Sequence, residues 1–189
     1  MKKLLLLFTF LFLSVVGLYA QNDFRKMNWG ESPEILKEKY PDISFEKVIE
    51  SDFAVYTYSD YTAGIEADII YMFENNAFQL GFYDFTPDRI SSYYEDYLRD
   101  YNNVSDILSE KYPVNDAHEW FNDTFEGQPN SLGFAISNSH VRLVENAITE
   151  SGTIISHSLG MKEGSLEHLL TYISAEAVLR LGESNRDDF

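Results

Sequence analysis

A seven-residue segment occurs twice in this chain and constrains its fold more than any other feature. Residues 35–41 read Ile-Leu-Lys-Glu-Lys-Tyr-Pro, and residues 107–113 read Ile-Leu-Ser-Glu-Lys-Tyr-Pro. The pattern is typical of the last turns of a helix that stops at a proline, because proline cannot continue a helix. Strand-like alternation of apolar and polar residues follows each copy. The repeat therefore predicts two similar units, each a helical segment followed by antiparallel strands.

The first unit is expected to begin with a short helix. Ser32 suits the N-cap position and Pro33 the first helical turn, so we expect a helix from there to about Tyr40. The apolar period then changes from 3.6 to 2, which predicts strands. These strands are expected over residues 43–49, 53–59, 65–74 and 77–85, with a loop over 60–64.

The last two of these strands form a predicted hairpin. Asn75-Asn76 suits a two-residue turn because Asn tolerates positive φ. Such a turn sets three apolar pairs on one face, namely Phe73 with Phe78, Tyr71 with Leu80, and Ile69 with Phe82.

The second unit is expected to begin with a longer helical region. Thr86-Pro87-Asp88 is a helix start, and apolar residues from Ile90 to Leu108 recur at intervals of four and three. Because Asn102-Asn103 interrupts this pattern, residues 87–111 form either one helix or two in line. The repeat favours a break, since only the second part has a counterpart at 32–40.

Strands are predicted again after Pro113. They are expected over residues 118–125, 132–137, 140–147 and 153–159. A turn at Asn138-Ser139 would set Ile136 opposite Val141 and Phe134 opposite Leu143. For residues 165–177, helical spacing of apolar residues favours a helix over a strand, and a polar tail follows from Gly182 to Phe189.

Together these features predict an α+β fold. Its regions are a signal peptide at 1–20, a first α+β repeat at 21–86, a second at 87–164, and a terminal helix or strand with a polar tail at 165–189. Each repeat is a short helical segment followed by a roughly four-stranded antiparallel sheet. We expect the two sheets to lie side by side or merge, with helices over one face and the other partly open.

The N-terminus predicts export. Lys2 and Lys3 precede an apolar run, and small residues lead to Ala20, as in a cleaved secretory signal peptide. The apolar run is shorter than the roughly 20 residues of a membrane-spanning helix. We therefore expect a periplasmic or secreted protein with no stable membrane insertion after signal cleavage.

Composition narrows the possible partners and chemistry. The chain has no cysteine, which excludes disulfides, thiol catalysis and zinc-thiolate sites. It has 14 basic and 31 acidic residues, and loss of Lys2 and Lys3 takes the net charge from −17 to −19. This charge opposes binding to nucleic acid and to anionic lipid, because such binding depends on Lys and Arg. It favours cationic partners or metal ions, or simply serves solubility.

No catalytic motif is complete in the sequence. Ser44 and Lys47 match the Ser-x-x-Lys pattern of penicillin-recognising enzymes, but the Lys-Thr/Ser-Gly element is missing because Glu150 precedes Ser151-Gly152. There is no phosphate-binding glycine loop and no nucleophile elbow. With 31 acidic residues, no particular acid–base pair stands out. We therefore expect no enzyme activity.

Metal and cofactor sites are not predicted either. None of the histidines, His118, His140, His157 and His168, is paired at the i, i+4 spacing of a helical metal site. His140 and His157 lie on predicted strands that could be neighbours, so a shared site is an alternative. No bound cofactor or metal is expected.

Candidate binding residues lie at the end of the second predicted strand. They are Tyr56, Tyr58, Asp60 and Tyr61. Tyrosine offers a large contact area with one polar group, which suits a protein-binding surface. In the alternative interpretation, Tyr56 and Tyr58 face the buried side of the sheet.

The tandem order of a helical segment and four antiparallel strands over most of residues 23–160 resembles the beta-lactamase inhibitor protein fold. More loosely, it resembles the small outer-membrane assembly lipoproteins, and Trp29-Gly30 before Ser32 resembles the opening of many secreted bacterial proteins. The disulfides of the first family and the lipid-attachment cysteine of the second are absent. The resemblance implies a non-catalytic module that contacts another envelope or extracellular protein. The alternative is a carrier or sensor of a small ligand or cation held between the sheets.

Overall fold

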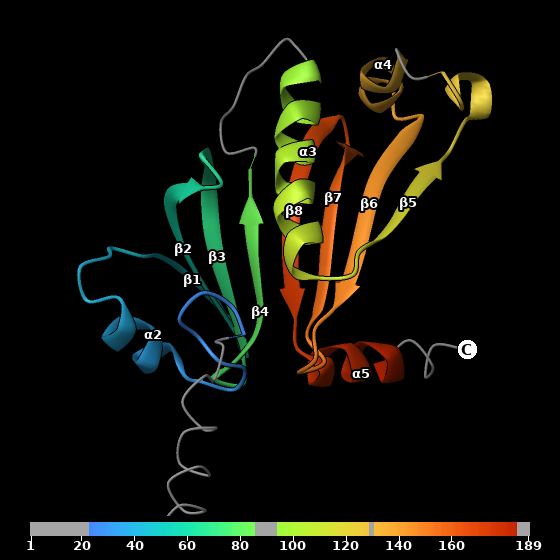
Figure 1. Cartoon of the computed structure of the whole chain (residues 1–189). Helices are drawn as coiled ribbons and strands as arrows, with labels where there is room; N and C mark the ends of the chain where they lie inside the picture. The colour runs from blue at the N-terminus through green and yellow to red at the C-terminus, as the bar shows by residue number, and fades with distance from the viewer. Residues whose placement is uncertain (1–22, 86–93, 129–130, 185–189) are drawn as a thin grey trace, which may run out of the picture.

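The structure, a computed structural model, describes residues 23–85, 94–128 and 131–184. The predicted signal peptide, the helix start at residues 86–88 and the end of the polar tail lie outside these ranges. The described residues form eight antiparallel strands and four α-helices, so the predicted α+β class is confirmed (Figure 1).

All eight strands belong to one sheet, in the order β1-β2-β3-β4-β8-β7-β6-β5. Strands β4 and β8 join its two parts, and Tyr83 lies opposite Leu170 there. Separate four-stranded sheets are therefore not formed. The strands are β1 (Glu46–Glu50), β2 (Phe53–Thr62), β3 (Ile65–Glu74), β4 (Ala77–Asp84), β5 (Asn115–Trp120), β6 (Val141–Ile148), β7 (Ile154–Lys162) and β8 (Ser165–Ile173).

Helices cover one face of this sheet. In Figure 1, α3 runs lengthwise in front of β8, α4 lies near the upper end of β6, and α5 lies across the lower end of the sheet. The helices are α2 (Pro33–Lys39), α3 (Tyr94–Lys111), α4 (Leu132–Ser137) and α5 (Ala175–Ser184), with a 3-10 turn η1 (Asp123–Phe125).

The repeated segment ends a helix in both places, as predicted. Helix α2 stops at Lys39 and α3 stops at Lys111. In each case the following tyrosine N–H donates to a leucine carbonyl, Tyr40 to Leu36 at 3.1 Å and Tyr112 to Leu108 at 2.9 Å. Both leucines are buried. The side chain of Ser32 makes no capping hydrogen bond, although the residue occupies the N-cap.

The hairpin between β3 and β4 keeps its predicted turn but not all of its predicted register. Asn75 and Asn76 both have positive φ, and Phe73 lies opposite Phe78. A β-bulge then shifts the pairing, so the two other predicted pairs are wrong: Leu80 lies opposite Met72 and Phe82 opposite Ile70. The bulge brings Gly81 to the core side, where it faces the Phe24 ring.

Helix α3 is continuous through Asn102-Asn103, so the predicted break is wrong. Both asparagines are exposed, and their weak helix propensity costs only a fraction of a kcal/mol each. The helix is held by its buried apolar stripe, which has the predicted spacing. That stripe consists of Tyr97, Tyr101, Val104 and Leu108.

Four further expectations are corrected. Residues 132–137 form α4 instead of a strand, and Val141 pairs with Trp120 instead of Ile136. Leu143 likewise pairs with His118 and Leu159, not with Phe134. The preferred helix at 165–177 is mostly strand β8, which was the alternative. Strand β2 continues to Thr62, so the loop expected at 60–64 is only a tight turn at Ala63-Gly64.

Two apolar clusters lie under the helices. The larger contains Leu36, Tyr71, Phe73 and Phe78 together with Ile155 and Leu170. The smaller lies between α3, α4 and strands β6 and β7. Within the described residues, no helix packs across the middle of the opposite sheet face, which we call the open face. The open face carries the even-numbered residues of β1, β3, β6 and β7 and, in β4, the even-numbered residues from Leu80 onward. It also carries the odd-numbered residues of β2, β5 and β8.

Candidate functional site

The four predicted binding residues do not share one surface. Tyr56 and Tyr58 point to the helix-covered side and are only 2% and 9% exposed, as the alternative interpretation expected. Tyr61 points to the open face and is 68% exposed. The alternation of side chains along β2 separates them, because residues an odd number of positions apart face opposite ways.

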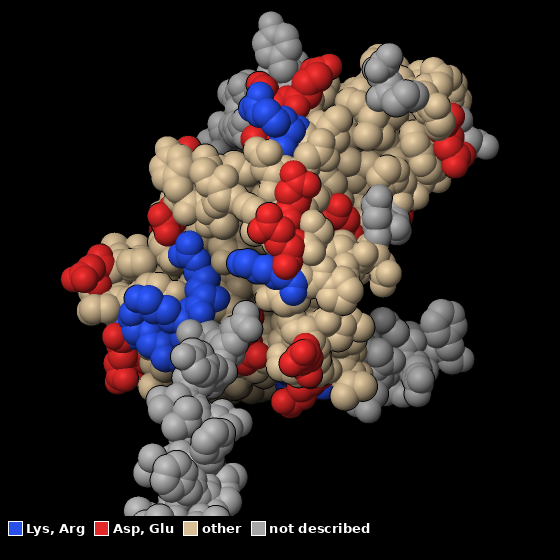
Figure 2. All heavy atoms as spheres, viewed as in Figure 1, with Lys and Arg blue, Asp and Glu red and all other residues tan. Residues whose placement is uncertain are grey.

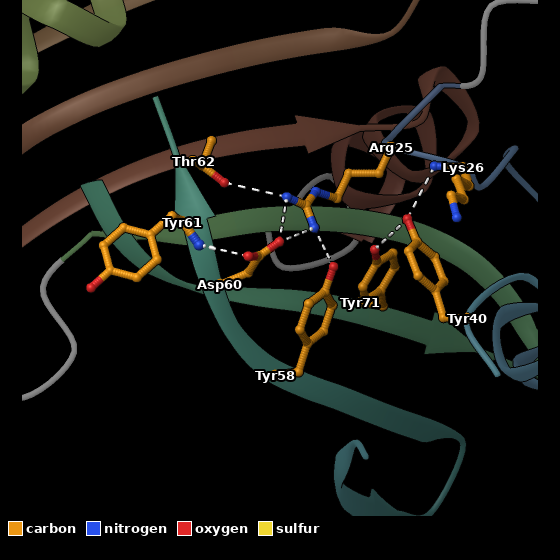
Figure 3. A network of polar contacts seen from close by, with 8 residues as sticks. All are labelled: Arg25, Lys26, Tyr40, Tyr58, Asp60, Tyr61, Thr62 and Tyr71. Carbon is orange, nitrogen blue, oxygen red and sulfur yellow. Dashed lines mark hydrogen bonds and ion pairs between the residues drawn. The ribbon is translucent and has the colours of Figure 1, made fainter. Parts of the chain in front are cut away.

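Tyr58 and Asp60 are brought together by Arg25, whose part the sequence did not indicate (Figure 3). The Arg25 guanidinium donates to the Tyr58 hydroxyl and forms an ion pair with Asp60 at 3.2 Å. It also donates to the Thr62 hydroxyl at 3.4 Å. Burial raises the pKa of Tyr58, although the nearby Arg25 charge acts in the opposite direction. The phenol therefore stays neutral and serves as a hydrogen-bond partner.

This network holds residues 24–27, a short N-terminal hairpin, against the sheet. Residues 24 and 27 pair with each other, and the Phe24 ring packs 5.3 Å from Tyr71 and 5.3 Å from Tyr172. Burial raises the pKa of Tyr71, which donates a hydrogen bond to Tyr40 at 3.2 Å. We assign Tyr56, Tyr58 and Asp60 to structure, because their side chains are occupied by contacts within the molecule.

The open face offers the exposed apolar side chains that a contact surface needs. Val48 on β1 is 57% exposed and Phe53 on β2 is 48% exposed, close to one another in the sheet register. A half-buried apolar row continues across β2, β3 and β4. It consists of Val55, Ile70, Met72, Leu80 and Phe82. We call these residues, with Val48, Phe53 and Tyr61, the apolar strip.

A buried polar chain lies under α3 on the other side of the sheet. The Nε2 atoms of His157 and His168 are 2.9 Å apart, and neither side chain is exposed. His157 Nδ1 lies 3.2 Å from Oε2 of Glu145, and the other carboxylate oxygen, Oε1, accepts a 2.6 Å hydrogen bond from the Ser105 hydroxyl. The sequence suggested His140 and His157 as neighbours. Instead, His140 precedes β6 and stacks on Phe125.

Burial and hydrogen bonding set the charge states of His157 and Glu145 in this buried polar group. Burial lowers the pKa of His157, while the hydrogen bond and charge of Glu145 oppose that shift. Burial acts to raise the pKa of Glu145, but hydrogen bonds from His157 and Ser105 outweigh it and hold the pKa below its usual value. A neutral His157 that donates to ionised Glu145 through Nδ1 has a free lone pair on Nε2, so His168 must donate there.

The pair was missed because residues 165–177 were expected to be helical. As strand β8, this segment places His168 diagonally across from His157 on the same face. Across the described ranges, no group of three or more His, Asp or Glu side chains is arranged to hold a metal ion.

Two of the hollows that the described residues line lie beside the sheet. The larger, about 1140 Å³, is open and polar, and its lining includes Asp60, Glu66, Asp68 and Asp100 beside Arg99. The smaller, about 140 Å³, lies between β4, β8 and α3 and is lined by aromatic side chains such as Tyr83 and Tyr172. Ligand pockets usually measure about 300–1,000 Å³, so the smaller hollow is too small for most organic ligands.

Neither a protein-family model, nor a curated protein, nor a solved structure matches this chain. Among the described helices, none combines the length and apolar character needed to cross a membrane.

Proposed function

We propose that the chain is an exported, non-catalytic protein-binding module of the bacterial cell envelope or exterior, and that the open face is its contact surface. The observation that carries this proposal is the apolar strip, which no described helix covers and whose Val48, Phe53 and Tyr61 are strongly exposed. Soluble proteins rarely leave large contiguous apolar patches in water unless the patch binds something.

The size and chemistry of these side chains fit a binding surface. Full burial of one large apolar side chain contributes roughly 1.5–3 kcal/mol, and aromatic residues often dominate interface energies. Tyr61 lies at one end of β2 and Phe53 at the other. Two exposed aromatic side chains thus stand at opposite ends of β2, on the open face that carries the half-buried apolar row.

The proposal includes a tandem architecture of the inhibitor-like type. Its support is the order of elements, with α2 before β1–β4 and α3 before β5–β8, and the repeated segment that ends both helices. In such an arrangement the helices stiffen the sheet from one side, and the other side remains available to a partner.

The proposal is tested by capture from envelope extract with the chain lacking its predicted signal peptide. A Phe53→Ser/Tyr61→Ser variant should lose a partner that the wild-type chain retains, because both exposed aromatic side chains are removed. The matched control is Tyr94→Ser/Ile107→Ser, which removes two exposed apolar side chains from α3 on the helix-covered side. The control should retain the partner. Equal recovery of every protein by the wild type and both variants would contradict the proposal.

The second candidate function is a carrier or sensor of a small cationic ligand. The observation that favours it is the larger hollow, whose lining holds several carboxylates beside a single arginine. A ligand that binds the native state raises the melting temperature by mass action. A rise of several degrees with millimolar Ca²⁺, Zn²⁺ or spermidine would favour this function over protein binding.

A further inference from the structure

The open face is acidic as well as apolar. At the positions that the sheet register assigns to this face, carboxylates outnumber basic groups by eight to two. The carboxylates are Glu46, Glu50, Glu66, Asp68, Glu74, Asp84, Glu119 and Glu167, and the basic groups are Arg142 and Lys162. On the helix-covered side, by contrast, basic side chains gather near α2 (Figure 2).

The basic groups near this face already have partners. Lys162 pairs with Glu167 at 3.5 Å, and Arg142 donates to Ser158 at 3.1 Å. Arg180 of α5 pairs with Glu74 at 2.9 Å. These contacts lie on β6, β7, β8 and the Glu74 end of β3, so they do little to neutralise β1 and the Glu66–Asp68 end of β3 beside the apolar strip.

Four carboxylates border the apolar strip without such compensation. Glu46 and Glu50 lie on β1, and Glu66 and Asp68 lie on β3. None of the four takes part in an ion pair with another described residue, and Asp68 only accepts a hydrogen bond from Ser59 at 2.6 Å. Glu66 lies directly opposite the exposed Tyr61. A partner that covers the strip would also meet these charges.

These carboxylates decide which kind of partner can cover the apolar strip. A second copy of the chain in an isologous dimer would bring the same carboxylates together, and like charges at an interface are costly. Anionic lipid and nucleic acid are repelled for the same reason. We propose, on the basis of the proposed protein-binding function, that the partner presents Lys and Arg side chains around a small apolar centre to the β1–β4 part of the open face.

Such a partner gains from both features of the surface. Its apolar centre covers the strip, and its cations approach the carboxylates at the edge, where charge pairs mainly raise the association rate and the specificity. Because the Debye length is about 10 Å at 0.1 M salt and about 3 Å at 1 M, binding of this kind weakens as salt is added.

The direct test uses a synthetic peptide that alternates lysine with valine and phenylalanine, and a matched peptide with glutamate in place of lysine. Binding is followed by fluorescence anisotropy, and the site is mapped by amide chemical shifts. The lysine peptide should bind and shift residues of β1–β3, while the glutamate peptide should not bind. A Glu46→Gln/Glu66→Gln/Asp68→Asn variant should bind the lysine peptide about tenfold more weakly.

The matched control removes the same number and type of charges from the helix-covered side. It is Glu38→Gln/Asp106→Asn/Glu110→Gln, at three exposed positions. The control should bind the peptide like the wild type. If both triple variants lose affinity equally, the attraction is only that of net charge, and the proposal is overturned.

The two proposals can fail separately. If capture from extract is lost in Phe53→Ser/Tyr61→Ser but unchanged in the open-face charge variant, the surface binds a protein, but not through basic groups. That result overturns this inference alone. If neither variant loses any protein that the wild type captures, the open face is not a protein-contact surface, and the proposed function is overturned together with this inference.

Discussion

At the scale of single residues, Gly81 shows how one side chain controls a strand. A Cβ at this position would lie 2.4 Å from the Phe24 ring, which is closer than real contacts allow. The β-bulge before Gly81 rotates β4 so that glycine, and not Leu80, faces this ring. The requirement came from Phe24, which lies more than 50 residues away in sequence, so the hairpin sequence alone could not reveal it.

We predict that Gly81→Ala destabilises the fold by about 1–3 kcal/mol, because overpacking forces a core ring to move. Urea unfolding measures this change. In a Phe24→Leu background the same substitution should cost less, since the smaller side chain leaves room for the new methyl group. The control is Gly133→Ala in α4, where the nearest atom lies 3.6 Å from the added Cβ. Gly133→Ala should be neutral or stabilising, and equal losses at both glycines would contradict the packing explanation.

At the scale of elements, strands β6, β7 and β8 together with α3 assemble a buried titrating group that no single segment contains. Glu145, His157 and His168 come one from each strand, and Ser105 comes from α3. Phe85 also packs on His168, and Tyr101 stacks on His157 with ring centroids 4.1 Å apart. These rings exclude water, which is why burial lowers the pKa of His157.

Stability should therefore fall as the solution is acidified. The folded-state pKa of His157 lies below its unfolded value of about 6.5, so the unfolded state binds more protons around that pH. Its contribution is fully present above about pH 6.5 and is lost progressively as the pH falls below that value through the lower folded-state pKa. The lowered pKa of Glu145 adds a loss at more acidic pH, below its unfolded value.

Urea midpoints measured from pH 7.5 to 5.5 test this expectation. In His157→Gln the decrease should be shallower than in the wild type, although the variant is less stable throughout. A slope unchanged by His157→Gln would show that other groups cause the acid sensitivity. If equimolar Zn²⁺ raises the melting temperature more than a shift to alkaline pH does, the two histidines bind metal.

At the scale of the whole molecule, the sheet and core connect the two parts of the chain. Phe24 contacts Tyr71 and Tyr172, and the Trp29 indole donates to Thr153 at 2.9 Å. The larger apolar cluster also includes Ile155 from β7. Because these contacts span both parts, we expect them to unfold together.

The two tryptophans allow this cooperativity to be measured. Trp29 precedes α2 and Trp120 lies at the end of β5, so each reports on a different part of the molecule. In Trp29→Phe and Trp120→Phe, the fluorescence transition of the remaining tryptophan should coincide with the circular dichroism transition of the same variant. Separate midpoints, or two calorimetric peaks, would show that the parts unfold independently.

Local patterns by themselves determined much of this fold. The Ile-Leu-x-Glu-Lys-Tyr-Pro repeat correctly ended two helices, Asn75-Asn76 correctly formed a turn, and alternation correctly located β3. Each of these features depends on neighbours within a few residues, where backbone propensities and the proline stop act directly. The fold class followed from their order along the chain.

Only tertiary structure decided the features on which function depends. Residues 132–137 became helix and 165–173 became strand because packing overrides weak or ambiguous local preference. Tyr56 and Tyr58 were separated from Tyr61 by the two faces of one strand, and which face is covered is set by helices elsewhere in the chain. Pairing of His157 with His168, and the acidic border of the apolar strip, arise from strand order. Strand order is fixed by burial of the whole core, which no local segment encodes.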